Sequence, residues 1–490
     1  MIASLNLPTV LQRNHVRFCG GVTFIPTYKG KAILSAAILA GSFAVTSCVE
    51  ASQILVRDIT LIDAASEKPR EHRDVLIEGD RIKSVGESGA LHSHNARTVD
   101  GRHKFLIPGL WNSHVHISTI DPALLPLYVA DGITSVRDMG GNVADLRQWR
   151  EEITSGKRVG PRIKFCGPMI EGSDKFSGPD TDKYNTANHI VAHNPAEARA
   201  LVAKIAADGA DCIKMRTFAD KETYFALANA AKAAELPFVG HPPFGLDPFE
   251  ALTVVQQTFE HAYYPYPLDQ YTPEKREALF SKMRANGVIL SPTLITWEPS
   301  RLKMDSLKKA FESVTPKTAP ARFISPSLQK SWAEGLLFMM DRGTPGWFKA
   351  LDKAASETGQ MYRAGIPVIP GTDDGAPFLE PVTSLYGEIE LLVRKAGLTP
   401  YEALVSATST PTKLFHQEAE LGTIEAGKYA DLVLLNTDPL MDTSWIAHID
   451  TVIAAGHVYD AAARRRLKES VRKALELEWR SAATEATKAH

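Results

Sequence analysis

The stretch Leu106-Ile107-Pro108-Gly109-Leu110-Trp111-Asn112-Ser113-His114-Val115-His116 decides the fold. It is an apolar, strand-like run that ends in two histidines two residues apart. Side chains at positions i and i+2 of a strand point to one face, so His114 and His116 can share one cation. Imidazole pairs of this kind suit zinc or another first-row metal.

Four further side chains of metal-ligand type stand at or near the ends of later apolar runs. They are Lys214, His241, His261 and Asp373. Taken alone, a histidine at a strand end is more often a hydrogen-bonded structural residue, and a lone lysine or aspartate is usually solvated. The order and position of all six side chains together indicate a two-metal hydrolase.

Short apolar runs recur through the middle of the chain, with helical patterns in the gaps. They cover residues 105–112, 133–138, 162–167, 211–215, 236–240, 255–260, 287–292 and 366–371. Eight strands close a parallel (β/α)8 barrel, whose strand ends converge on one face. We therefore predict an α/β fold with a TIM barrel over residues 108–418 and an insertion at about 293–364 that covers the mouth.

Both ends of the remaining chain are rich in strand patterns. Residues 52–107 and 419–460 alternate as strands do, which predicts a small flanking β-sandwich built from both segments. Residues 461–490 have few helix breakers and predict a C-terminal helix on the barrel surface. Its Arg464-Arg465-Arg466 run is interpreted as a solvated face.

The first 51 residues differ from the rest. Lys29 and Lys31 precede an apolar stretch, Ala32 to Val45, that is followed by Thr46-Ser47-Cys48. This pattern resembles a bacterial lipoprotein signal, in which lipidated Cys48 would tether the protein to a membrane. The alternative is a plain Sec signal that is cut near Ala51. Either way we expect an exported protein, periplasmic or anchored as a lipoprotein.

Composition excludes some classes of protein. The chain has 490 residues, 44% of them apolar, and a net charge of -2, so it is globular and too weakly charged to argue for a nucleic-acid partner. Outside the export segment only Cys166 and Cys212 remain. Two cysteines give no disulfide framework, and we expect both to pack as small hydrophobic side chains.

Several motifs together carry a resemblance to a known family. They are Leu106 to His116, Asp131 to Asp138, Glu260-His261, Gly371-Thr372-Asp373 and Gly422 to Asp431. With these motifs the chain resembles the amidohydrolase superfamily, in its imidazolonepropionase-like and Xaa-Pro dipeptidase (prolidase)-like branch. The motifs span nearly all of the chain beyond the export segment.

The resemblance implies a ligand set and a mechanism. His114, His116 and Asp373 would hold one divalent metal, and His241 and His261 the other. Lys214, carboxylated by CO2, would bridge them, and Asp373 would orient a bridging hydroxide and pass its proton to the leaving group. Zinc is expected first, with manganese, cobalt or iron as alternatives.

Lys214 also discriminates between branches. The resemblance implies that one-metal imidazolonepropionases lack the bridging lysine, whereas dipeptidase-like members keep it. The other interpretation of Lys214 is a surface lysine that happens to end a strand.

Substrate residues are harder to assign, because the loops depart from the branch at His241-Pro242-Pro243 and at Met215-Arg216-Thr217. Arg216 is a candidate clamp for a substrate carboxylate, although an outward salt bridge is the commoner fate of such an arginine. Tyr263, Tyr264 and Trp297 could line a substrate pocket or pack beneath the insertion. Asp374 is a poor ligand candidate, because neighbouring strand residues face opposite sides.

We therefore expect a hydrolase of C–N amide bonds in small molecules, either Xaa-Pro-like dipeptides or N-acyl amino acids. One alternative is hydrolysis of cyclic amides, lactones or xenobiotic amides and esters. Another is a barrel scaffold without catalysis, which would have no need of all six ligands. The sequence leaves open whether the chain forms a homo-oligomer.

Overall fold

The computed structural model describes residues 52–172, 188–216, 221–241, 243, 246–262, 268–299, 302–342, 350–441 and 443–488. Within residues 51–490 the chain forms one compact unit. The predicted export segment, including Cys48, lies outside the described residues. Among the residues that are described, no helix is both long and apolar enough to cross a membrane.

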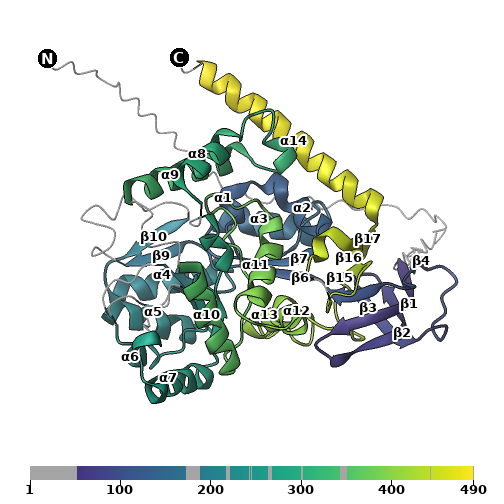
Figure 1. The fold of residues 1–490 in the computed structure, drawn as a ribbon, viewed down its shortest axis with the longest axis horizontal. Helices are drawn as coiled ribbons and strands as arrows, with labels where there is room; N and C mark the ends of the chain where they lie inside the picture. Colours follow the sequence, from purple (N-terminus) through teal and green to yellow (C-terminus); the bar gives the residue numbers. More distant parts are fainter. Residues whose placement is uncertain are drawn as a thin grey trace, which may run out of the picture. The chain divides into compact units, whose positions relative to one another are not determined.

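One mixed sheet combines strands from both ends of this unit (Figure 1). From the first part of the chain come β1 (Gln53–Asp63), β2 (Ser66–Glu78), β3 (Arg81–Glu87), β4 (Arg97–Asp100) and β5 (Phe105–Pro108). Near the other end lie β15 (Leu432–Leu435), β16 (Ile449–Ala454) and β17 (His457–Tyr459). The order is β17-β16-β15-β5-β1-β2-β3, with β4 paired to β1. The prediction of a β module from both segments is confirmed, but its strands join in one sheet where a sandwich has two.

The strand predicted at 105–112 is divided between two sheets at Gly109. Residues before it form β5 of the mixed sheet, and β6 (Leu110–Val115) begins a parallel sheet with β7 (Ile133–Asp138) and β8 (Arg162–Phe165). A Cβ atom at position 109 would lie 2.1 Å from Thr134 Oγ1. Only glycine therefore lets the chain pass from one sheet to the other at this point.

A second parallel sheet has the order β10-β9-β11-β12-β13-β14. Its strands are β9 (Met169–Gly172), β10 (His189–Ala192), β11 (Ile213–Met215), β12 (Phe238–Gly240), β13 (Thr258–Glu260) and β14 (Ile289–Ser291). β9 and β10 were not predicted. The eighth predicted strand, 366–371, contributes only an isolated bridge between Val368 and Leu290, and Asp374 forms another with Val115. Among the described residues these pairings form no closed barrel, so that part of the prediction is not shown.

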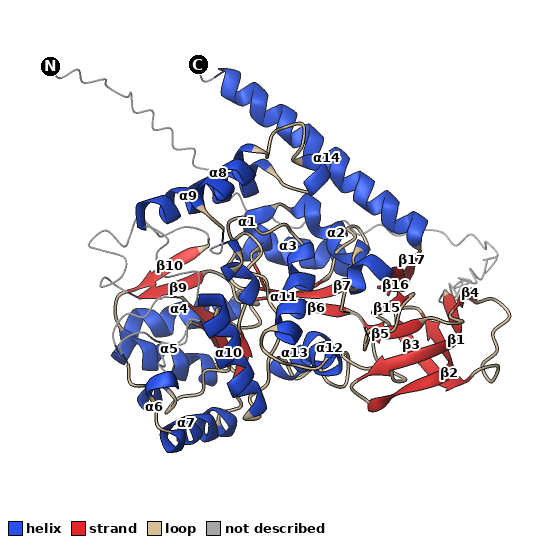
Figure 2. Cartoon of the chain, viewed as in Figure 1, coloured by secondary structure: helices blue, strands red, loops and turns tan. Residues whose placement is uncertain are grey.

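Helices follow most of the parallel strands and cover them (Figure 2). They include α2 (Leu125–Ala130), α3 (Val143–Thr154), α4 (Pro195–Ala207), α5 (Lys221–Ala233), α7 (Pro273–Ala285), α10 (Ala350–Arg363), α11 (Thr383–Arg394) and α12 (Pro400–Thr408). Several start at a side-chain cap, as at Asn142, Asn194 and Thr272. α12 starts with a capping box between Thr399 and Glu402.

The predicted insertion carries extra helices. After β14 come α8 (Met304–Glu312) and α9 (Pro326–Arg342), and α9 packs on α1 (Ile117–Ile120), the turn that follows His116. The hydroxyls of Ser325 and Ser327 donate to the Ile120 carbonyl at 2.6 and 2.8 Å. The insertion therefore lies against the loop that leaves the strand with the two histidines.

The C-terminal helix α14 (Ala461–Lys488) packs on α2, as Figure 1 shows along one side of the molecule. Lys468 Nζ lies 2.6 Å from the buried Asp131 carboxylate, and Trp479 Nε1 donates to the Ile324 carbonyl at 2.9 Å. The prediction of a surface helix docked on the main body is confirmed.

The two cysteines are bonded to each other, which the sequence analysis did not predict. Cys166, just after β8, and Cys212, just before β11, form a disulfide with a Cα–Cα distance of 4.3 Å. Both are buried in a cluster that also contains Met139, Val239 and Ile289. The sequence concealed the bond because 46 residues separate the cysteines, and only the pairing of distant strands brings them together.

Candidate metal centre

Five of the six predicted ligands lie at the carboxyl ends of parallel strands or directly beyond them, and Asp373 lies on the segment that bridges to β6. His114 is in β6 and His116 follows it, Lys214 is in β11, and His241 and His261 follow β12 and β13. Asp373 is held by its backbone N–H, which donates to the His114 carbonyl at 2.8 Å. We call these six residues, His114, His116, Lys214, His241, His261 and Asp373, the metal cluster.

His114 is fully buried at the centre of the cluster. Its Nε2 lies 3.3 Å from Lys214 Nζ and 3.4 Å from Asp373 Oδ1. Its ring centroid is 4.5 Å from that of His261 and 5.5 Å from that of His116. A Cβ atom at Gly371 would lie 2.5 Å from the His114 Cβ, so glycine is required where the Asp373 segment crosses this histidine.

His116 is placed by the turn that follows β7. The Asp138 carboxylate accepts from the backbone N–H groups of Ile117 at 2.7 Å and Gly140 at 3.0 Å. His116 Nδ1 lies 3.1 Å from the Gly140 carbonyl, which can only accept, so Nδ1 carries the hydrogen. Its Nε2 therefore faces Asp373 Oδ1, at 3.1 Å.

Lys214 is 1% exposed, which decides against the interpretation as a surface lysine. Burial lowers the pKa of Lys214 to about 8, although the carboxylates of Glu260 and Asp373 oppose that shift. A larger fraction of this amine than of an exposed lysine is therefore uncharged near neutral pH.

His241 and His261 form the other side of the cluster, with ring centroids 4.8 Å apart. His261 Nδ1 lies 3.0 Å from Thr293 Oγ1. The backbone φ angles of His261, Thr293 and Asp373 are 69°, 44° and 57°, a left-handed conformation that non-glycine residues rarely adopt. Such strain concentrates at functional sites.

The protonation states of side chains in the metal cluster suit the binding of a metal cation. Burial is the main cause that holds the pKa of His114, His241 and His261 well below its ordinary value, so these imidazoles are neutral. The pKa of Asp373 lies well below its usual range, although burial opposes that shift. Neutral imidazoles and an ionised carboxylate are the donors that zinc and related metals prefer.

The geometry also fits a cation. One ligand atom each from His114, His261 and Asp373 all lie within 4.8 Å of one another. Asp374 does not join them, as predicted: its Oδ2 accepts from Tyr128 Oη at 2.6 Å, and burial raises its pKa to about 6.

Two charged residues that sequence reasoning missed lie beside the cluster. Glu260 Oε2 is 2.7 Å from His114 Nδ1, and Arg137 Nη2 donates to both Glu260 oxygens at 2.9 and 3.0 Å. Both side chains are buried. In the sequence, each of the two residues directly follows a strand segment that has no charged side chain. Ile133–Val136 precede Arg137, and Thr258-Phe259 precede Glu260.

The structure places the predicted substrate-binding residues in different surroundings. Arg216 Nη1 donates to Glu171 Oε1 at 2.5 Å, and its side chain remains 44% exposed. Trp297 packs against a buried hydrophobic cluster. Tyr263 and Tyr264 lie outside the described residues, and so does Thr217, which follows Arg216.

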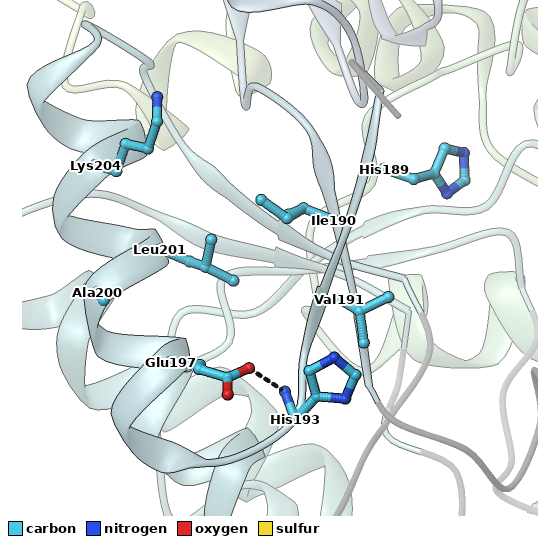
Figure 3. A pocket seen from close by; sticks show the side chains of 8 residues that line it. All are labelled: His189, Ile190, Val191, His193, Glu197, Ala200, Leu201 and Lys204. Atoms are coloured by element: carbon cyan, nitrogen blue, oxygen red, sulfur yellow. Dashed lines mark hydrogen bonds between the residues drawn. The ribbon is translucent and has the colours of Figure 1, made fainter. Parts of the chain in front are cut away.

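A separate cavity of about 630 Å³ lies between β10 and α4 (Figure 3). Ile190 and Val191 come from the strand side, and Glu197, Leu201 and Lys204 come from the helix. The Glu197 carboxylate accepts from the His193 backbone N–H at 3.0 Å. Of the described residues that line this cavity, none belongs to the metal cluster, so we do not assign the reaction to it.

Comparisons with known proteins agree with this picture. The imidazolonepropionase of Geobacillus kaustophilus is 32% identical over 133 residues, which is 26% of this chain and 31% of that protein. The match therefore spans less than a third of that relative. The imidazolonepropionase of Shouchella clausii is 22% identical over 436 residues, 82% of this chain and 90% of the relative.

Among solved structures, a Xaa-Pro dipeptidase with methionine bound in its active site has a similar fold. The TM-score is 0.63 at 22% identity, and the match covers 84% of this chain and 100% of that one. The sequence profile of the Amidohydrolase family matches residues 105–459, the greater part of the chain and all six residues of the metal cluster. The chain therefore belongs to the amidohydrolase family.

Proposed function

We propose that this protein hydrolyses a C–N amide bond in dipeptides or N-acyl amino acids with two divalent cations held by the metal cluster. One observation carries the proposal. Nδ1 of His114 and His116 contacts Glu260 and the Gly140 carbonyl, respectively, so Nε2 of both rings faces Asp373 Oδ1, at 3.4 and 3.1 Å. A cation placed among these three atoms would be bound by all of them.

The cluster divides into two ligand sets. His114, His116 and Asp373 would hold one cation, and His241 and His261 the other. Lys214 would bridge them as a carbamate, since an ammonium cannot bind a cation. Its pKa of about 8 supports this step, because the neutral amine attacks CO2, forms an N–C bond and releases one proton.

When bound, the cations supply Lewis acidity at the scissile carbonyl and lower the pKa of the attacking water. Asp373 is the ionised carboxylate of the cluster, and its side chain is 23% exposed. It takes the proton of the attacking water and delivers it to the leaving amine nitrogen. Burial of His114 and Lys214 excludes bulk water from the inner side of the cluster.

The position of Arg216 favours substrates that carry a free carboxylate. Its guanidinium is anchored on the buried Glu171 through Nη1, and it is close enough to Lys214 and His241 to lower the pKa of both. A partly exposed guanidinium at the rim of the cluster can bind a carboxylate through its other nitrogens. The likeness in fold to a Xaa-Pro dipeptidase is consistent with such substrates.

A second candidate is hydrolysis of a cyclic amide. It is favoured by the sequence relatives, which are named imidazolonepropionase. The buried Lys214 argues for the first candidate, because the family resemblance implies that the one-metal members lack this lysine.

We also infer that the two parallel sheets belong to one (β/α)8 barrel. Asp211 N donates to the Phe165 carbonyl at 2.7 Å, which links β8 to the start of β11. The segment from Val368 to Asp374 contacts β14 on one side and β6 on the other. β8 and β9 would then be two halves of one interrupted strand.

Export is proposed on the signal-like sequence before Cys48. The Cys166–Cys212 disulfide supports it, because disulfides persist mainly in oxidising compartments. Palmitate labelling of the wild type and of Cys48→Ala tests the lipid anchor. Label in the wild type alone supports it, whereas label in neither leaves a cleaved Sec signal as the route.

Hydrolysis assays on metal-loaded protein test the activity. The panel holds Xaa-Pro dipeptides, other dipeptides, N-acyl amino acids and imidazolone propionate, with zinc or manganese and bicarbonate present. Turnover of dipeptides or N-acyl amino acids supports the first candidate, and turnover of imidazolone propionate alone supports the second. If metal-replete protein hydrolyses none of these compounds, both candidates are contradicted. If the protein retains no metal, the scaffold without catalysis is favoured.

A further inference from the structure

A buried ion pair lies directly behind the metal cluster. Arg137 and Glu260 are 1% and 0% exposed, and Arg137 Nη2 contacts both carboxylate oxygens. Arg137 Nε also donates to the Ser113 carbonyl at 2.5 Å, which ties the pair to β6. A buried ion pair is weak evidence for stability, since apolar residues of the same volume often replace one without loss.

Glu260 also contacts a residue of the metal cluster, which gives the ion pair a specific role. Its Oε2 lies 2.7 Å from His114 Nδ1. An ionised carboxylate has no hydrogen to donate, so Nδ1 must carry the hydrogen of this bond. The other ring nitrogen, Nε2, is then left with its lone pair, and it is the nitrogen that faces Lys214 and Asp373.

We propose that Glu260, fixed by Arg137, is a positioning residue that sets the tautomer of His114 and aims its Nε2 at the cation. The inference rests on the proposed function, because it assigns a task to residues behind that same cluster. A ligand imidazole that donates its second N–H to a carboxylate is held in one orientation and becomes more basic. Arg137 contributes by holding both carboxylate oxygens, so that Glu260 cannot rotate away from His114.

The competing explanation is that Glu260 only neutralises Arg137. In that case the contact with His114 is incidental, and loss of the negative charge changes stability without changing the tautomer. The two explanations therefore differ in the state of the imidazole, which can be measured without any metal.

The first measurement is ¹⁵N NMR of histidine-labelled, metal-free protein, with His114→Gln to assign the signals. We expect the wild-type His114 to carry its hydrogen on Nδ1 and Glu260→Gln to give a mixture of tautomers, because its amide can donate as well as accept. A wild-type ring with its hydrogen on Nε2, or an unchanged tautomer in Glu260→Gln, overturns the proposal.

The second measurement is zinc affinity by competition with a chelator. We expect roughly a 10- to 100-fold loss in Glu260→Gln, the range typical of a lost carboxylate partner behind a ligand histidine. Glu388→Gln is the matched control, since Glu388 is equally buried and accepts from the Ile295 backbone N–H at 2.7 Å. We expect its zinc affinity to equal that of the wild type. Equal affinities in all three proteins overturn the proposal.

Glu260→Gln leaves Arg137 buried without its counter-charge, which can prevent folding. The double variant Arg137→Gln/Glu260→Gln removes both charges and keeps a neutral hydrogen-bonded pair, and the same two measurements apply to it. Failure of the proposed function has a different signature. Wild-type protein that binds no zinc contradicts the metal hydrolase, whereas the tautomer of the metal-free protein still tests the role of Glu260.

Discussion

Lys214 Nζ lies 3.3 Å from His114 Nε2, although 100 residues separate the two in the chain. The same nitrogen of His114 is the one that faces Asp373, so an ammonium at Lys214 competes with a cation for its lone pair. Carboxylation of the amine removes this competition and replaces a donor with two anionic oxygens.

Lys214→Met tests this relationship. We expect the bound zinc to fall from two ions to one or fewer, and hydrolysis to fall by about three orders of magnitude, because no group then bridges the two ligand sets. Metal content and turnover are measured on the same preparation. Lys204→Met is the control, since that lysine is exposed and pairs only with Asp208 in the described contacts. Two retained zinc ions in Lys214→Met contradict the bridging role.

Arg216→Ala tests recognition of a carboxylate. A hydrogen bond to a charged group contributes about 1.5–3 kcal/mol, so we expect KM for substrates with a free carboxylate to rise roughly 10- to 100-fold. The kcat should change little, and amidated analogues should be unaffected. Arg150→Ala, which removes an arginine paired with Asp211, serves as the control. An equal effect on amidated substrates shows that Arg216 acts through structure alone.

The disulfide is expected to stabilise the fold. Its sequence separation of 46 residues corresponds, in the chain-entropy view, to about 4 kcal/mol of the free energy of unfolding. Urea unfolding of wild type and of Cys166→Ala/Cys212→Ala measures the difference. Reductant should lower the stability of the wild type and leave that of the double variant unchanged. Four free thiols in the unreduced, denatured 490-residue chain would rule out the bond, because Cys19 and Cys48 alone account for two.

We expect the buried Glu388 to make the free energy of unfolding depend on pH. Burial raises its pKa to about 8 from an ordinary value of 4.5. Below pH 4.5 the carboxyl is protonated in both the folded and the unfolded chain, so it causes no penalty. As the pH rises from about 4.5 to about 8, the unfolded chain ionises first and the folded state loses stability, on the order of a few kcal/mol.

Glu388→Gln cannot ionise and should escape that loss. We expect its free energy of unfolding to exceed that of the wild type by a margin that grows between pH 4.5 and pH 8 and is constant above it. Denaturant unfolding at a series of pH values gives the margin. A margin that is the same at every pH shows that Glu388 ionises normally in the fold.

The sequence by itself predicted that the six residues of the metal cluster come together. His114 and His116 share a face because strand side chains alternate with a period of two, and the same rule excluded Asp374. The carboxyl ends of parallel strands meet at one edge, so ligands as distant as His116 and Asp373 could be grouped before any contact was known. Strand patterns at both ends of the chain likewise predicted a β module from both segments, although as a sandwich and not as one mixed sheet.

Only the tertiary structure decided which side chains touch. The Cys166–Cys212 bond, the Glu260–His114 contact and the burial of Lys214 all depend on which strands become neighbours. Strand β9, which begins directly after Gly167-Pro168, was also not predicted, because the predicted apolar run ended at residue 167. Local sequence patterns determine the direction in which a side chain points. Its contact partner depends on the long-range packing of strands that are distant in the sequence.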